Sequence, residues 1–341
     1  MATAQRIVLA ARPVGEPKPE NFRLEETPVP TPAQGQVLLR TIWLSLDPYM
    51  RGRMSDAPSY AAPVQIDQVM EGGTVSEVMA SNNPDFKAGD VVLSRAGWQT
   101  HFISDGKGLR KIDAKAAPTS TALGVLGMPG MTAYTGLLDI GKPQPGETVV
   151  VAAASGAVGS AVGQIAKIKG ARAIGIAGGA DKCKYVKEVL GFDECIDHRD
   201  PDMAAKLKAA CPKGIDVYFE NVGGKVFEAV LPLLNPFARI PVCGLIAQYN
   251  AFEEEKGGKA MSFLMRNVLT KRLTIRGFIV SDFAARYNDF IADMTKWFAE
   301  GKLKHRESVA EGLPNAPQAF MGMLRGENFG KQLVRIGPDK A

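Results

Sequence analysis

With 341 residues, the chain is too long for one ordinary hydrophobic core, so its length predicts about two domains. The net charge of +5 comes from Lys and Arg interspersed with Asp and Glu, and without a basic block no nucleic-acid partner is expected. No run approaches about 18 apolar residues, and no signal-peptide core is found, so neither a membrane span nor secretion is expected. Four widely spaced cysteines without a CxxC pair favour free thiols in a reducing cytoplasm.

The first third of the chain is predicted to be rich in β-strands. Residues 7–10, 36–40 and 90–93 are short β-prone runs bounded by proline, glycine or asparagine. Three prolines between residues 27 and 34 favour a loop or a sheet edge there. We therefore expect a small, partly open barrel.

From residue 147 onward, apolar strands alternate with helical patterns. The predicted strands are residues 148–152, 172–177, 215–219, 239–243 and 273–280, and the predicted helices include residues 157–169 and 181–190. This alternation predicts a parallel, doubly wound α/β sheet. The chain then ends on a helix and a strand at residues 332–336. We therefore predict a β-rich domain of residues 1–125 and 297–341, and an α/β domain of residues 126–296.

The strongest functional signal is at residues 149–164, where a buried strand leads through a turn of small residues into a helix. In a dinucleotide-binding turn, Gly156 lets the backbone approach a pyrophosphate, while Gly159 and Gly163 let the helix pack close to the strand. Ala154 replaces the first glycine of the usual fingerprint, and the alternative is a purely structural glycine turn. The predicted phosphate-binding residues, at the helix start, are Gly156, Ala157, Val158 and Gly159.

The end of the second α/β strand bears on the choice between NAD and NADP. It holds Gly178 and Gly179 instead of the acidic residue that binds the ribose 2′-hydroxyl of NAD. Lys182 follows, and can meet a 2′-phosphate as a point charge. Alternatively, Asp181 caps a helix and Lys182 is a solvated surface residue. The first interpretation predicts NADPH as the cofactor.

Five segments are specific as a set: Leu-Asp-Pro-Tyr-Met-Arg at residues 46–51, Gly-Met-Pro-Gly-Met-Thr-Ala-Tyr at 127–134, the turn at 153–164, Glu-Asn-Val-Gly-Gly at 220–224, and Gly-Glu-Asn-Phe-Gly-Lys at 326–331. Together they resemble the leukotriene B4 12-hydroxydehydrogenase/prostaglandin reductase family of zinc-independent medium-chain dehydrogenase/reductases, and within it the bacterial curcumin reductase branch. The match covers nearly the whole chain. The resemblance implies a Rossmann domain with a GroES-like catalytic domain, an active site in the cleft, NADPH as cofactor, and a homodimer.

The resemblance also implies which residues bind the cofactor. Lys182 matches the residue that holds the 2′-phosphate. His198 stands where relatives often carry a tyrosine near the adenine ribose; it either contacts the cofactor or merely ends a strand. Asn221 and Asn328 either bind the cofactor or cap turns. The residues implied to line the nicotinamide half are Asn221, Cys243, Gly244, Tyr249, Phe278, Ile279, Val280 and Asn328.

No zinc site is expected. All four cysteines lie beyond residue 180, and the histidines are His101, His198 and His305. A catalytic zinc needs three protein ligands, and no such set can be assembled in the β-rich part. Without a Lewis acid, alcohol oxidation loses its means of polarising oxygen.

The chemistry that remains natural is conjugate reduction of an α,β-unsaturated ketone or aldehyde. Hydride transfer to the β-carbon builds negative charge on the carbonyl oxygen, and a preorganised O–H donor at that oxygen lowers the barrier. Tyr249 and Tyr60 match tyrosines that face the substrate carbonyl in the family, and Tyr49 lies in the turn at residues 46–51. Each of the three is otherwise a half-buried packing residue.

Two alternative functions stay open. A quinone oxidoreductase has the same fold and cofactor but needs no positioned enolate donor. A non-catalytic NADPH-binding redox sensor binds the cofactor without oxidising it.

Overall fold

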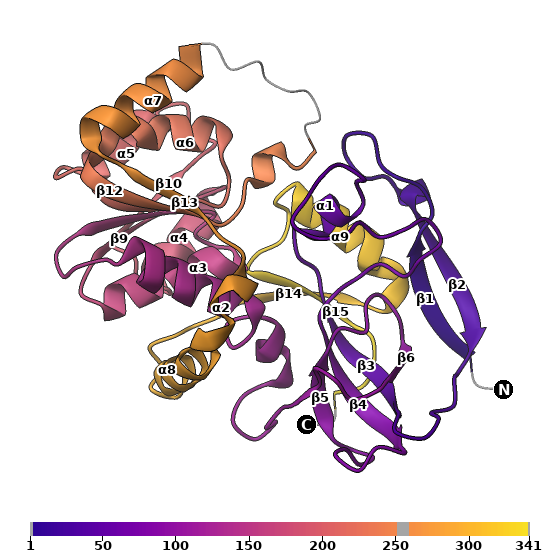
Figure 1. Cartoon of the computed structure of the whole chain (residues 1–341). Coiled ribbons are helices and arrows are strands. Elements are labelled where there is room, and N and C mark those ends of the chain that lie inside the picture. Colours follow the sequence, from indigo (N-terminus) through magenta and orange to yellow (C-terminus); the bar gives the residue numbers. More distant parts are fainter. Residues whose placement is uncertain (1–2, 251–258, 340–341) are drawn as a thin grey trace. The chain divides into compact units, whose positions relative to one another are not determined.

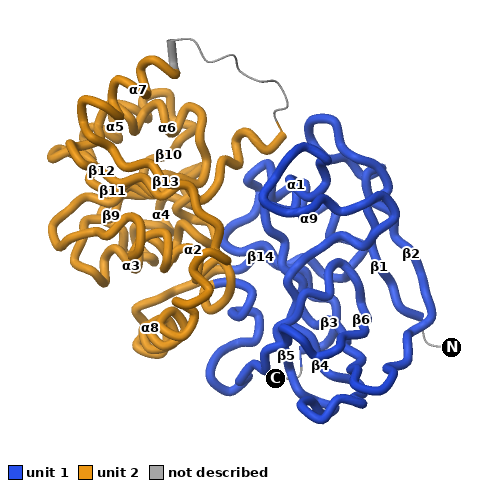
Figure 2. Tube along the Cα trace, in the orientation of Figure 1, with its two compact units in different colours: residues 1–124, 307–341 blue, residues 125–306 orange. Residues whose placement is uncertain are grey.

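The computed structural model describes residues 3–250 and 259–339 and contains two compact units (Figure 2). Unit 1 comprises Met1–Gly124 and Glu307–Ala341, and unit 2 comprises Val125–Arg306. The first part of unit 1 is therefore joined by a C-terminal segment that returns to it. The domain limits proposed from the sequence, at residues 125/126 and 296/297, stay a prediction.

Unit 2 is built on a sheet of six parallel strands in the order β10-β9-β8-β11-β12-β13. The strands are β8 (Thr148–Ala152), β9 (Arg172–Ala177), β10 (Glu194–Asp197), β11 (Ile215–Phe219), β12 (Leu234–Val242) and β13 (Thr274–Gly277). Three of them have the predicted bounds, β10 was not predicted, and the strand predicted at residues 273–280 is shorter. The winding direction changes between β8 and β11 because β9 and β10 lie on one side of β8.

Helices cover both faces of this sheet (Figure 1). The helices of unit 2 are α2 (Met128–Thr135), α3 (Ala157–Ile168), α4 (Ala180–Glu188), α5 (Met203–Ala210), α6 (Gly224–Val230), α7 (Lys259–Lys271) and α8 (Tyr287–Ala299), with short turns η3 (Gly136–Gly141), η4 (Leu231–Leu233), η5 (Ile246–Gln248) and η6 (Val280–Arg286). One core packs α2, α3, α4 and α8 against the sheet. A second core packs α5, α6 and α7 on the other face.

Unit 1 is mainly β-structure. Its larger sheet has the order β14-β15-β3-β4-β5-β7, with β6 also paired to β3, and β1 pairs with β2 separately. The strands are β1 (Thr3–Leu9), β2 (Phe22–Pro28), β3 (Val37–Ser45), β4 (Thr74–Ser81), β5 (Val91–Ser94), β6 (His101–Ser104), β7 (Arg110–Lys111), β14 (Glu307–Glu311) and β15 (Lys331–Arg335). The helices are α1 (Met50–Arg53) and α9 (Ala316–Leu324), with turns η1 (Pro19–Asn21), η2 (Thr119–Leu123) and η7 (Leu313–Asn315).

A buried ion pair joins the two parts of the chain that make up unit 1. The ammonium of Lys331 lies 2.9 Å from a carboxylate oxygen of Asp47 and donates a hydrogen bond of 2.6 Å to the carbonyl of Leu46. Both charged side chains are buried, so each compensates for the lost hydration of the other. The C-terminal strand β15 is thereby fixed to the turn that follows β3.

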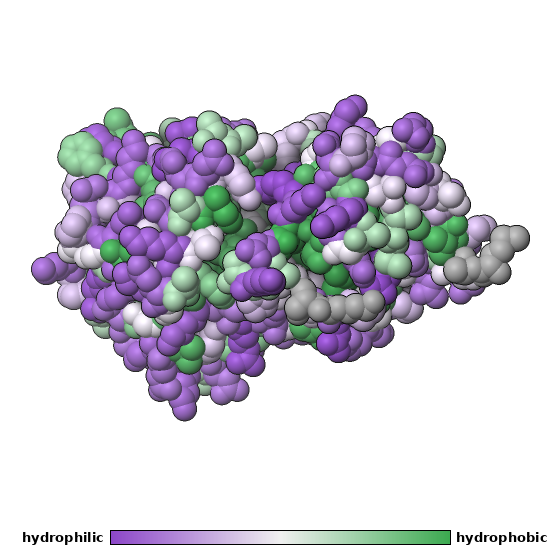
Figure 3. Space-filling model, turned by 90° about the horizontal axis from the view of Figure 1, so that it is seen from below, coloured by the Kyte–Doolittle hydropathy of each residue, from purple (hydrophilic) through white to green (hydrophobic). Residues whose placement is uncertain are grey.

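The predicted fold class, a doubly wound Rossmann sheet with a GroES-like β-rich domain, is confirmed. Among the described residues, none forms a helix long and apolar enough to cross a membrane. Polar residues cover most of the face seen in Figure 3, with apolar residues in smaller patches.

The packing of α3 against its neighbours predicts one position where a methyl group cannot be added. A Cβ at Gly163 would lie 1.8 Å from the ring of the buried Phe192. Overpacking of this kind costs roughly 1–3 kcal/mol. Gly163→Ala is therefore expected to lower the midpoint of urea unfolding of unit 2, measured by circular dichroism. Gly52→Ala, where nothing lies within 4 Å of the added carbon, is the matched control, and equal midpoints for both variants would contradict the packing argument.

Candidate cofactor and substrate sites

The turn between β8 and α3 is shaped to bring a ligand close to backbone N–H groups. Ala153 has a positive φ of 51°, and the N–H of Gly156 donates to its carbonyl at 2.9 Å. A Cβ at Gly159 would lie 2.3 Å from that carbonyl oxygen, so only glycine allows the first turn of α3 to approach the strand end. Ala157 and Val158 complete this first turn, where a helix has N–H groups without intrahelical partners.

The loop after β9 is held by a carboxylate from the neighbouring strand. Asp197, at the end of β10, accepts hydrogen bonds of 2.9 Å from the backbone N–H groups of Gly179 and Arg199. Partial burial acts to raise the pKa of Asp197, but these donors and nearby positive charges outweigh it, so the pKa is lowered. The Asp197 carboxylate therefore stabilises the loop at Gly178 and Gly179, which itself lacks the acidic residue typical of an NAD site.

Three basic side chains gather at this loop. A Cβ added at Gly178 would lie 2.7 Å from the Nε2 atom of His198 and 3.3 Å from the Nε atom of Arg199, so both side chains lie against this glycine. The pKa of Lys182 is lowered, first by partial burial and then by the positive charge of Arg199. Partial burial, Arg199 and Lys182 also lower the pKa of His198. An anion such as a phosphate would stabilise the neighbouring positive charges of Lys182 and Arg199.

Arg199 was not identified from the sequence. It follows β10, a four-residue strand with two acidic ends that carries no clear β pattern. Only the pairing of β10 with β9 brings Arg199 beside Lys182.

The ends of β8 and β11 are tied together by a side-chain amide. The Nδ2 group of Asn221 donates to the carbonyl of Ala152 at 2.8 Å. The preceding residue, Glu220, is buried and accepts hydrogen bonds from the N–H groups of Val222 and Gly223 at 2.6 and 2.8 Å. Burial raises the pKa of Glu220. The predicted residue Asn221 thus has a structural contact and lies at the carboxyl edge of the sheet, and Glu220 is a second organising residue that the sequence reasoning missed.

The end of β12 brings Tyr249 back to the sheet edge. The N–H groups of Cys243 and Gly244 donate to the carbonyl of Glu220 at 2.9 and 3.2 Å. The hydroxyl of Tyr249 lies against Gly244, only 2.8 Å from where an added Cβ would stand. It also accepts a hydrogen bond of 3.4 Å from the N–H of Leu245. The hydroxyl group is therefore directed to the carboxyl end of β12, where ligands bind in parallel sheets.

The remaining predicted cofactor residues lie in two separate places. Phe278 is buried after β13 and packs edge-on against Phe219, while Ile279 and Val280 are half-buried beside it. Asn328 lies in unit 1, where its Nδ2 group donates to the carbonyl of Gly330 at 2.8 Å. This hydrogen bond stabilises the turn at residues 328–330, so Asn328 has a structural contact within unit 1.

The other two candidate tyrosines lie together in unit 1. The guanidinium of Arg53 stands 4.5 Å from the ring centroid of Tyr60 and 5.7 Å from that of Tyr49. Burial raises the pKa of Tyr49, and the negative charges of Asp47 and Glu71 add to the effect. The hydroxyl of Tyr49 therefore stays protonated and able to donate a hydrogen bond.

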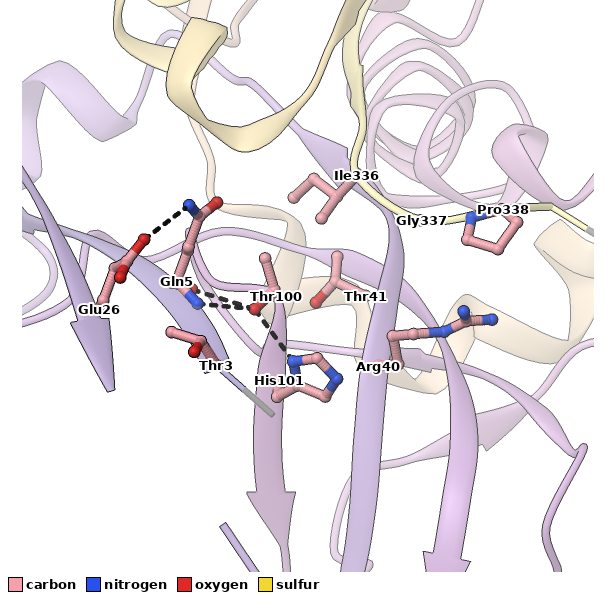
Figure 4. A pocket seen from close by; sticks show the side chains of 10 residues that line it. All are labelled: Thr3, Gln5, Glu26, Arg40, Thr41, Thr100, His101, Ile336, Gly337 and Pro338. Atoms are coloured by element: carbon pink, nitrogen blue, oxygen red, sulfur yellow. Dashed lines mark hydrogen bonds between the residues drawn. The ribbon is translucent and has the colours of Figure 1, made fainter. Parts of the chain in front are cut away.

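A separate pocket of about 300 Å³ lies in unit 1 between β1, β3 and β6 (Figure 4). Thr100 shares a hydrogen bond of 3.0 Å with the Nδ1 atom of His101, and Gln5 reaches toward Glu26. None of the predicted site residues lines this pocket, whose residues are Thr3, Gln5, Glu26, Arg40, Thr41, Thr100, His101, Ile336, Gly337 and Pro338. Within residues 3–250 and 259–339, no cluster of three or more His, Cys, Asp or Glu could hold a metal ion.

Comparison with known proteins gives matches along nearly the whole chain. Residues 5–112 match the family "N-terminal domain of oxidoreductase" and residues 157–300 the family "Zinc-binding dehydrogenase". The chain is 58% identical to an NADPH-dependent curcumin reductase of Escherichia coli (strain K12), covering 98% of this chain and 97% of the relative. It is 38% identical to a 2-alkenal reductase (NADP(+)-dependent) of Nicotiana tabacum, covering 97% of each. The crystal structure of CurA in complex with NADPH from Vibrio vulnificus has a TM-score of 0.95 and 58% identity, covering 98% of this chain and 100% of that chain.

The basic cluster predicts how the protein distinguishes NADPH from NADH. One charge-assisted hydrogen bond is worth roughly 1.5–3 kcal/mol, so Lys182→Ala is expected to weaken NADPH binding about 10- to 100-fold. Arg199→Ala is expected to weaken it in the same direction, and neither change should alter NADH binding. Fluorescence titration with both cofactors measures this. Lys184→Ala, on the same helix with an exposed side chain, is the control; equal binding of both cofactors by the parent protein would refute the assignment.

Proposed function

Since the chain belongs to the zinc-independent medium-chain dehydrogenase/reductases of the leukotriene B4 12-hydroxydehydrogenase/prostaglandin reductase family, we propose that it uses NADPH to reduce the carbon–carbon double bond of α,β-unsaturated ketones and aldehydes. The observation that carries this function is the identity of 58% to a curcumin reductase over almost the entire chain. The similarity to a 2-alkenal reductase supports the same reaction on a smaller substrate.

The residues at the carboxyl edge of the unit 2 sheet fit a dinucleotide. The start of α3 suits the pyrophosphate, because the N–H groups of Ala157 to Gly159 meet the negative charge there. Lys182, His198 and Arg199 suit the 2′-phosphate, because Lys182 and Arg199 place two positive charges near each other and the neutral His198 can donate a hydrogen bond to the same anion. The loops after β11, β12 and β13 remain for the nicotinamide half, with Asn221, Gly244 and Val280 among their residues.

When bound, NADPH supplies the hydride that adds to the β-carbon of the substrate. The protein must then stabilise the negative charge that develops on the carbonyl oxygen. We assign this task to the hydroxyl groups of Tyr249 and Tyr60, with Tyr49 as the third candidate. Support for Tyr249 comes from its hydroxyl position at the end of β12. A proton delivered from water to the α-carbon completes the reduction.

The reaction is tested by following NADPH oxidation with a panel of enones, enals and quinones, and by identifying the products. Tyr249→Phe keeps the ring and removes the hydroxyl, which is the proposed donor and also accepts the long hydrogen bond from Leu245, so kcat for an enone should fall on the order of 10²-fold while NADPH affinity is unchanged. Tyr287→Phe on α8 is the control for loss of a hydroxyl outside the strand ends. Consumption of quinones with no saturated enone product would instead identify a quinone oxidoreductase, and NADPH binding without any turnover would identify a redox sensor.

We further propose that the chain forms a homodimer through one face of unit 2. Strand β13 is an edge of the parallel sheet, and Ile275 at its centre is 39% exposed. Met261, Met265 and Leu269 recur every four residues on α7 and are all exposed, which gives an apolar stripe next to β13 in the chain. An open edge can pair with its own copy, and a twofold axis closes such a contact.

The dimer is tested by analytical ultracentrifugation of the parent protein and of Leu269→Lys and Ile275→Lys. Because both changes place a charge in the proposed contact, they are expected to shift the mass from dimer to monomer without loss of folding. Val189→Lys, at another exposed apolar residue of unit 2, should stay dimeric. A parent protein that sediments as a monomer would refute the proposal.

A further inference from the structure

Arg53 is an unusual residue because its charged side chain is buried. It ends the short helix α1, directly after the turn that carries Tyr49, and is 5% exposed. Its Nε atom lies 2.6 Å from a carboxylate oxygen of Glu71. This ion pair compensates for the hydration that the guanidinium loses on burial. The family motif at residues 46–51 stops before Arg53, so the assignment of functions above leaves this residue without a role.

The contacts of Arg53 converge on the segment of residues 55–64. Its Nη1 atom donates a long hydrogen bond of 3.4 Å to the carbonyl of Ala61, and its own carbonyl accepts one of 2.8 Å from the N–H of Val64. Tyr60 directly precedes the first of these contact points, Ala61, and is 59% exposed. The guanidinium covers the Tyr60 ring at 4.5 Å, so the ring of an otherwise exposed loop residue is held from one side.

The same guanidinium also faces Tyr49, with 5.7 Å between its central carbon and the ring centroid. One planar cation thus contacts both tyrosines of unit 1 that are candidates for the substrate carbonyl. A lysine could keep the charge and the pairing with Glu71. It could not present a flat face to an aromatic ring and donate hydrogen bonds in the plane of that face at the same time.

We propose that Arg53 is a positioning residue for the reduction, which fixes the Tyr60 ring, and with it the 55–64 segment, in the orientation that the substrate requires. The inference rests on the proposed function, because it acts through a tyrosine assigned to the substrate carbonyl. Arg53 itself touches neither substrate nor cofactor in this role.

The test is Arg53→Lys. Loss of one stacked cation contact is expected to lower kcat/KM for an enone roughly 5- to 30-fold, with NADPH affinity unchanged. In the Tyr60→Phe background, the same change should cause a smaller loss than it does alone, because the hydroxyl that Arg53 positions is already absent. Arg12→Lys is the matched control, since Arg12 donates to the carbonyl of Met54 in the adjoining turn and should tolerate the change.

A second measurement does not depend on turnover. Hydrogen–deuterium exchange of residues 55–64 should become faster in Arg53→Lys and in Tyr60→Leu, and should be unchanged in Tyr60→Phe, which keeps the aromatic ring. Because Tyr60 is exposed, Tyr60→Leu leaves the buried ion pair intact and is expected to fold.

The outcomes separate the two proposals. A parent protein that reduces no enone would refute the proposed function. Normal enone reduction by the parent protein together with an unaffected Arg53→Lys variant would refute only this inference. Unchanged exchange in both Arg53→Lys and Tyr60→Leu, or losses that are fully additive with Tyr60→Phe, would also overturn it.

Discussion

The parallel pairing of β8 with β9 on one side and β11 on the other is the constraint on which the candidate cofactor site depends. From β8 the chain builds the sheet first toward β9 and β10 and then, on the other side, toward β11, β12 and β13. The carboxyl end of β8 therefore lies at the switch point of the sheet, where ligands bind in open α/β folds. The hydrogen bond from Asn221 to the carbonyl of Ala152 strengthens this edge. The turn at Gly156 and the loops after β11 and β12 are therefore brought together by the sheet itself.

Charge is distributed around this edge in a way that favours a phosphorylated ligand. Asp197 is occupied by two backbone N–H groups, so its negative charge stabilises the loop rather than competing with an anion. Arg199 lies close enough to Lys182 for its positive charge to lower the pKa of that lysine. The loop at Gly178 and Gly179 is hydrogen-bonded to Asp197 and has basic residues beside it. It therefore combines close approach of the backbone with the positive charge that a phosphorylated ligand requires.

Unit 1 depends on a different device, because its chain is discontinuous in sequence. The buried pair of Lys331 and Asp47 fixes the returning C-terminal strand to the turn before Tyr49. Arg53, four residues after Tyr49, forms a second ion pair with Glu71. The guanidinium of Arg53 also faces the rings of Tyr49 and Tyr60. Two charge pairs in succession thus define the path of the segment that carries the candidate tyrosines, where loop backbone alone would allow many orientations.

The sequence by itself determined β8, β9 and β11 and the start of α3, because buried strands are apolar runs between turn residues and the glycine spacing at residues 156–163 is local. It also indicated Lys182, which lies in the first turn of α4, five residues after β9 ends. The contacts of Arg199, Glu220 and Arg53 are set only by the tertiary structure. Arg199 depends on the pairing of β10 with β9, Glu220 on burial under its own loop, and Arg53 on a carboxylate 18 positions away. Such contacts join residues that strand pairing and packing bring together, and the local pattern of a single sequence contains no signal for them.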